Sequence, residues 1–127
     1  MPIISISLDE NTLQELAQLE REIGFSGRSE AIRAGIEASL VENLQRKKLS
    51  GHVKAVLLIV HGETAEERAT DVKHDFEDII STQIHSNLRK GKCLEIFVLG
   101  GNAERVKEFV ARMQSNRGMD YVKLIVP

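Results

Sequence analysis

Three side chains that bind transition metals well fall in one segment of the sequence. Cys93, the only cysteine, comes eight residues after His85 and nineteen after His74. A thiolate and two imidazoles are ligands that Zn(II), Co(II), Cu(I) and Ni(II) accept in proteins. A single cysteine is just as often a small buried apolar residue. The spacing alone therefore leaves two equal alternatives. Either the three residues form a metal site, or the cysteine is buried and the two histidines lie on the surface.

The composition sets limits on the class of protein. With 127 residues, 42% hydrophobic and 28% charged, the chain should form one domain or two small ones. No leader and no apolar run of about 18 residues is present, which predicts a cytoplasmic protein with no membrane segment. The net charge of −2 and the 4% aromatic content argue against a broadly basic surface and against stacking on single-stranded bases. No nucleophile–base or acid–base pair is evident, so we do not expect an enzyme.

Residues 53–127 alternate between strand and helix patterns. Strands are expected at 53–60, 82–89, 93–101 and 121–127, and helices at 65–80 and 102–115. This βαββαβ order predicts a ferredoxin-like α+β domain, in which both helices cover one face of a four-stranded antiparallel sheet.

That arrangement would bring some of the polar residues together. His85 and Asn87 are two apart on one strand and therefore share a face, and Cys93 begins the neighbouring strand. The three side chains can converge. His74 lies near the end of the preceding helix and would join them most easily from a second subunit.

Residues 1–48 predict a separate strand–helix–helix domain, joined to residues 53–127 by the short linker 49–52. Residues 3–9 alternate as in a half-buried strand. A helix of about 14 residues should follow from Asp9 to Gly24, and Ser29 should cap a second helix that ends in the basic run 46–48. The side chains expected to face inward on the second helix are Ala31, Ile32, Ile36, Leu40 and Leu44. A lone strand leaves its backbone unpaired, so we expect it to pair with the same strand of a second chain.

This pattern resembles the ribbon-helix-helix repressors, whose paired strands enter the major groove of double-stranded DNA. The resemblance implies that Ile3, Ser5 and Ser7 face the bases and that Arg28 and Ser29 hold a phosphate at a helix N-terminus. Residues 1–48 contain six Lys and Arg against eight Asp and Glu, so attraction to DNA must be local. Arg21, Arg28 and Arg33 are the candidates for it.

Over nearly its full length the chain resembles the NikR family of nickel-responsive transcriptional regulators. The resemblance is carried by RSEAIR at 28–33, by the spacing of the two histidines and the cysteine, and by CLEIFVLGG at 93–101. It implies a ribbon-helix-helix domain joined to an ACT-like domain, in a homotetramer that binds an operator as a repressor. It also implies a square-planar nickel ion between subunits, held by His85 and Cys93 of one chain and by His74 of the partner.

Three positions depart from the family pattern. Asn87 stands where the family has a further ligand histidine, and an amide oxygen is a weaker ligand than imidazole. Asn87 could bind weakly, His61 or water could complete the site, or the preferred ion could be Co(II), Zn(II) or Cu(I). Ala34 stands where the family has an acid that helps bind a cation between the domains. Glu77 replaces a common family histidine and could equally be a solvated carboxylate, and His52 and His61 are more typical of ordinary surface or strand-end residues.

Two further functions stay open at this point. The ACT-like domain could sense a small organic effector, with a metal site that has been lost. Alternatively, the chain could be a metal-binding or storage module that uses its N-terminal ribbon only to dimerise, although the Ser5 and Ser7 face argues against that.

Overall fold

The computed structural model describes all residues, Met1–Pro127, and the chain divides into two compact units, Met1–Lys47 and Lys48–Pro127. The first unit contains the helices α1 (Glu10–Leu19) and α2 (Arg28–Lys47), with a π-helical turn at Glu20–Gly24. The second unit contains β1 (His52–Gly62), α3 (Glu63–Asp75), β2 (Ile80–Asn87), β3 (Lys92–Asn102), α4 (Ala103–Gln114) and β4 (Met119–Ile125). No helix combines the length and the apolar character that crossing a membrane requires.

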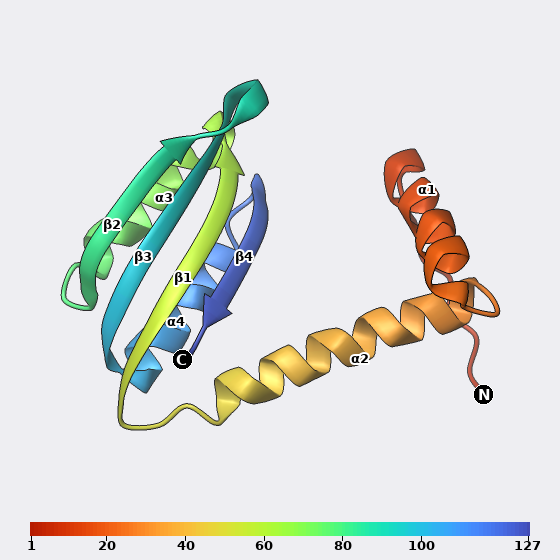
Figure 1. The fold of residues 1–127 in the computed structure, drawn as a ribbon, viewed down its shortest axis with the longest axis horizontal. Helices are drawn as coiled ribbons and strands as arrows, with labels where there is room; N and C mark the ends of the chain where they lie inside the picture. The colour runs from red at the N-terminus through yellow and green to blue at the C-terminus, as the bar shows by residue number, and fades with distance from the viewer. The chain divides into compact units, whose positions relative to one another are not determined.

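The second unit is an α+β domain with a four-stranded antiparallel sheet, as the sequence predicted. The strand order is β2-β3-β1-β4, and α3 and α4 lie together on one face of the sheet (Figure 1). The two central strands are therefore the first and third in the sequence. Helix α3 connects the parallel strands β1 and β2, which flank β3, and α4 connects the parallel strands β3 and β4, which flank β1.

Strict alternation in β1 and β3 builds the core. The buried side chains of these strands all point toward the helices: Val53, Ala55, Leu57, Ile59 and His61 on β1, and Cys93, Glu95, Phe97 and Leu99 on β3. Phe109 of α4 lies at the centre, with its ring 5.4 Å from Phe97 and 5.1 Å from Phe76. Two of the positions in these buried rows are polar, His61 and Glu95, and both lie toward the same end of the sheet.

The face of the sheet away from the helices is also apolar, and no other element of the second unit covers it. The strand register aligns Ile84, Ile96 and Leu58 in one row across β2, β3 and β1. Ile84 is 53% exposed and Tyr121 of β4 is 50% exposed. A monomer would leave this surface in water, which is typical of a protein interface.

Helix α3 ends five residues earlier than predicted. Phe76 leaves the helical conformation (φ −124°, ψ 22°), and the amide of Ile79 donates to the carbonyl of Phe76 in the turn that follows. Both side chains are nevertheless buried. The periodic apolar residues that predicted a longer helix reach the core from a turn instead. Strand β2 begins two residues before the predicted position as a result.

Helix α4 has a side-chain cap whose removal should be measurable. The Asn102 Oδ1 atom accepts from the amide of Glu104 at 2.8 Å, which satisfies one of the free donors at the helix start. Asn102→Ala should lower the free energy of unfolding by about 1 kcal/mol. Urea unfolding measures this, and Asn102→Asp, which keeps an acceptor oxygen, should retain most of the stability. Equal stability of the alanine variant would contradict the role of the cap.

The first unit has almost no core of its own. Leu16 and Ala31 are its buried apolar residues, whereas Ile36, Leu40 and Leu44 of α2 are each more than half exposed. The prediction that these three face inward is therefore wrong for a single chain. Residues 1–9 form no strand, which also departs from the prediction. The physical reason is the same in both cases, since a strand and an apolar helix face both need a partner and one chain offers none.

The ends of the first helix follow the predicted caps, but the start of the second does not. The Asp9 carboxylate accepts from the Thr12 amide at 2.7 Å, and Gly24 has a positive φ of 85° after the π-helical turn. Helix α2 starts at Arg28, so Ser29 lies inside the first turn and is not the cap. Glu30 reaches back to accept from the amide and hydroxyl of Ser26. These hydrogen bonds from Ser26 lower the pKa of Glu30.

Candidate metal centre

A hollow at one end of the sheet gathers three of the four predicted metal ligands. It has a volume of about 200 Å³ and is lined by Glu63, Glu66, His85, Asn87, Leu88, Gly91, Lys92 and Cys93. The register of the hairpin explains why His85, Asn87 and Cys93 lie together. Asn87 pairs with Cys93 and His85 pairs with Glu95, so these side chains share one face of the sheet. The start of α3 supplies the two carboxylates.

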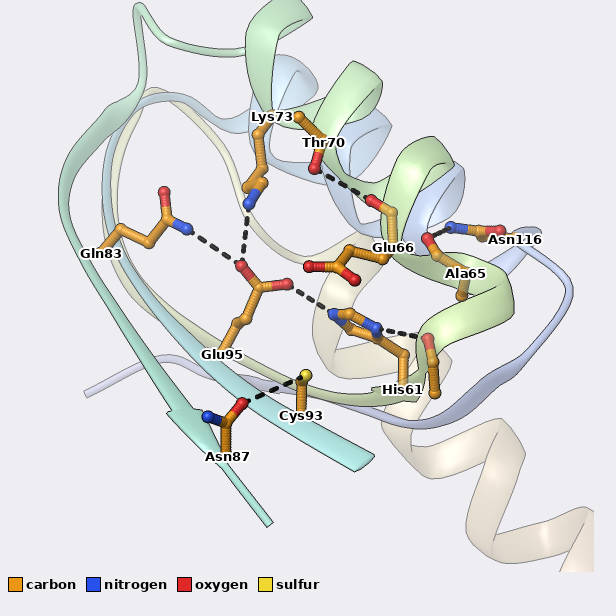
Figure 2. A network of polar contacts seen from close by, with 11 residues as sticks. His61, Ala65, Glu66, Thr70, Lys73, Gln83, Asn87, Cys93, Glu95 and Asn116 are labelled. Carbon is orange, nitrogen blue, oxygen red and sulfur yellow. Dashed lines mark hydrogen bonds and ion pairs between the residues drawn. The ribbon is translucent and has the colours of Figure 1, made fainter. Parts of the chain in front are cut away.

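Cys93 is nine-tenths buried, and its thiol lies 3.8 Å from the Oδ1 atom of Asn87 (Figure 2). His85 and Asn87 are exposed on β2. The hollow therefore combines a sheltered sulfur with two exposed candidate ligands on an edge strand. No group of three His, Cys, Asp or Glu side chains is close enough in this chain to hold an ion.

His74 lies in a different hollow. This second hollow is lined by Thr70, Lys73, His74, Glu77, Ile80 and Gln83, between α3 and β2. The Nδ1 atom of His74 is 2.8 Å from the Oε1 atom of Glu77. A carboxylate accepts, so Nδ1 carries the proton and Nε2 is left as the nitrogen available to a metal. Both side chains are largely exposed.

Between the two hollows lies a buried charged network that the sequence did not predict. The Glu95 carboxylate, 1% exposed, accepts from Lys73 at 2.9 Å and from Gln83 at 2.9 Å, and lies 2.6 Å from the Nε2 atom of His61 (Figure 2). Burial alone would raise the pKa of Glu95, but the hydrogen bonds from Lys73 and His61 outweigh it and lower the pKa. Glu95 is therefore an anion that Lys73 and His61 hold in place.

His61 is fully buried, contrary to the expectation of an ordinary surface or strand-end residue. Its Nδ1 atom lies 3.0 Å from the carbonyl oxygen of Gly62, which can only accept, and its Nε2 atom faces the Glu95 carboxylate. Both nitrogens of His61 therefore face oxygen atoms of the protein. Neither nitrogen is free for a metal, which removes His61 as the ligand that completes the site.

The sequence contained a signal for this network. The buried positions of β1 and β3 are the odd-numbered ones, which include Glu95, and extending that alternation by one step beyond Ile59 places His61 on the same buried face. A buried polar residue needs a partner, and the register supplies it across the two strands.

The residues predicted to contact DNA all lie in the first unit. Ile3 is 95% exposed, and Ser5 and Ser7 are exposed in the extended segment before α1. Arg28 and Ser29 lie in the first turn of α2, and Arg33 follows on the same helix, all exposed. Ala34, at the position of the missing acid, is half-buried.

Comparisons with known proteins place this chain among metal-dependent regulators. Residues 54–126 match a family described as the NikR C-terminal nickel-binding domain. A chain named as a nickel-responsive regulator in Methanococcus maripaludis strain C7 is 34% identical over 129 aligned residues, which cover 99% of this chain and 92% of that one. A chain of the same name in Methanocaldococcus jannaschii is 32% identical with the same coverage.

The solved structures add the fold. An uncharacterised protein of Thermotoga maritima superposes with a TM-score of 0.56 at 18% identity, covering 60% of this chain and 98% of that one. At this identity the match supports the βαββαβ fold and nothing about function.

Proposed function

Because the chain belongs to the NikR family of nickel-responsive transcriptional regulators, we propose that it is a homotetrameric repressor whose hold on operator DNA depends on a bound metal ion. The family is one of regulators and not of enzymes. The observation that carries the proposal is the hollow at the end of the sheet, where a sheltered thiol and an imidazole line one space.

His85 and Cys93 would hold the ion from one chain, and His74 would reach it from a partner. Support comes from the separate hollows of His74 and Cys93, since one chain does not bring the three together. A thiolate with imidazoles fits Ni(II), Co(II), Zn(II) and Cu(I) alike. The ion would join two subunits because it would bind ligand side chains from both of them.

The exposed apolar surfaces support the assembly. The first unit would dimerise by pairing residues 3–9 and by covering Ile36, Leu40 and Leu44 of α2. The open face of the sheet, with Ile84 and Tyr121, would supply a second contact between chains. Two separate apolar surfaces per chain are what a dimer of dimers needs.

Contacts with DNA would come from the paired N-terminal segments. Ser5 and Ser7 can donate to or accept from base edges, Ile3 can contact a thymine methyl, and the first turn of α2 with Arg28 can hold a phosphate. Metal would favour one placement of these segments over others, provided that it binds that arrangement more tightly. A protein that acts on DNA in this way works in the cytoplasm.

The test is an anaerobic titration of the apo-protein with Ni(II), Co(II), Zn(II) and Cu(I), combined with DNA binding. Double-stranded sequences are first selected from a random pool with metal-loaded protein, and their affinity is then measured with and without each ion. Tight stoichiometric binding and a metal-dependent gain in affinity are expected. Binding no tighter than micromolar for every ion would contradict the proposal and favour an organic effector in the ACT-like domain, a reading that Asn87 already makes the main alternative.

Glu77 should act through His74. By accepting from Nδ1, the carboxylate fixes the tautomer and strengthens the opposite nitrogen as a ligand. Glu77→Ala should weaken metal binding by the assembled protein by about 10–100-fold. Chelator competition measures this, and Glu77→Gln, which keeps an acceptor oxygen, should recover part of the loss. Unchanged affinity in the alanine variant would mean that Glu77 is only a solvated carboxylate.

A further inference from the structure

The hollow beside Cys93 contains a carboxylate to which neither the sequence nor the family match assigned a role. Glu66 lies on the first turns of α3 and lines the same hollow as His85 and Cys93. Figure 2 shows its side chain turned from α3 toward the end of the sheet that carries His61 and Cys93. The backbone carbonyl of Glu66 accepts from Thr70, but its carboxylate makes no hydrogen bond or ion pair in the structure.

The charge of the hollow favours a cation. Glu63 and Glu66 both contribute carboxylates, whereas the one basic side chain that lines the hollow, Lys92, is paired with Asp120 at 2.6 Å. Two carboxylates beside a buried thiol would repel one another in the absence of a positive ion. A divalent metal would neutralise them.

The other residues that could complete the site are worse donors. Both nitrogens of His61 are engaged by Gly62 and Glu95, and the Glu95 carboxylate is engaged by Lys73. Asn87 offers only a neutral amide oxygen. Glu66 is exposed and its carboxylate makes no existing contact, so its side chain is free to turn on binding, which the separation of the candidate ligands in this chain requires.

We propose that Glu66 is an oxygen ligand of the metal beside His85 and Cys93, taking the place that Asn87 leaves open and setting which ion the protein prefers. This rests on the proposed function, because it takes the same site to be a metal centre. Thiolate, imidazole and carboxylate are each ligands that Zn(II) accepts, and Zn(II) has no geometric preference of its own; the same donors suit Co(II). It suits planar Ni(II) less, because that ion prefers nitrogen and sulfur donors.

The experiment compares Zn(II), Co(II) and Ni(II) affinities of the full-length protein and of Glu66→Gln by competition with a chelator. The variant should lose at least about 10-fold in Zn(II) and Co(II) affinity, because even groups that only support a ligand are worth about 10–100-fold. Nickel affinity should change less. The visible bands of the Co(II) protein, which report the ligand set, should also shift in the variant.

Matched variants decide between the outcomes. Glu67→Gln alters the neighbouring exposed carboxylate, which does not line the hollow, and should leave all affinities unchanged. If Glu66→Gln behaves like Glu67→Gln, or if Glu63→Gln causes the loss instead, the assignment of Glu66 is wrong and the metal site itself stands. If the unaltered protein binds no ion and Cys93→Ser makes no difference, it is the proposed function that fails.

Discussion

Loss of the Cys93 thiol should abolish the effect of metal on DNA binding while the protein stays folded. The sulfur is the softest donor in the hollow and lies nine-tenths buried beside His85 and Asn87, where water competes poorly for the ion. Supporting groups around metal ligands are worth about 10–100-fold in affinity, and a direct ligand should exceed the upper end of that range. DNA affinity measured with and without metal should then coincide in Cys93→Ser.

The control for this variant is Ser86→Ala. Ser86 lies on β2 between His85 and Asn87 but points to the other face of the sheet, where it pairs with Leu94. It should keep the full metal response, and circular dichroism of both variants checks the fold. A metal response that survives in Cys93→Ser would exclude the thiol from the site.

Removal of the Glu95 carboxylate should produce the largest loss of stability. Glu95→Ala would leave the buried His61 and the partly buried Lys73 without their shared anion. Breaking a buried ion pair by deleting one partner costs about 3–5 kcal/mol, because the remaining charge is uncompensated. Urea unfolding of the apo-protein measures this without any contribution from metal.

The pH dependence of that stability has a definite sign. The pKa of Glu95 is lowered in the folded protein, so its ionised form stabilises the fold above the ordinary glutamate pKa of about 4.3. That contribution should be lost as the pH falls below this value, through the lowered pKa of the folded state. Glu95→Ala should therefore flatten the acid limb of the stability curve.

The comparison variant is Glu108→Gln, which removes one side of an exposed pair with Arg105 at 3.6 Å. Surface pairs contribute little, so its stability should change by less than about 0.5 kcal/mol. A Glu95→Ala variant as stable as Glu108→Gln would show that the network carries no net stability.

Much of the second unit could be predicted from the sequence because its strands alternate and its helices are amphipathic. The βαββαβ order predicted the four-stranded antiparallel sheet, and the convergence of His85, Asn87 and Cys93 follows from the hairpin register. Periodicity could not locate the end of α3, because Phe76 and Ile79 are apolar at helical spacing yet enter the core from a turn.

The first unit shows what one sequence cannot specify alone. Residues 3–9 have the alternation of a strand, but an isolated strand gains no backbone hydrogen bonds, and the segment has no regular structure in a single chain. Likewise, the apolar face of α2 predicted a core that one chain does not build. The polar network of His61 and Glu95 was missed for a different reason: we expected His61 to be an ordinary surface or strand-end residue and assigned no role to Glu95, although the alternation placed both in the core.

Because His74 lies apart from the hollow of Cys93, the response to metal should depend on the concentration of the protein itself. Under our proposal two chains share each ion, so occupancy depends on the concentration of assembled protein as well as on that of free metal. Diluting the protein below its assembly threshold would release metal at a constant metal concentration. A cell that makes more of this regulator would therefore respond to a lower concentration of metal, although the ligands of the site are unchanged.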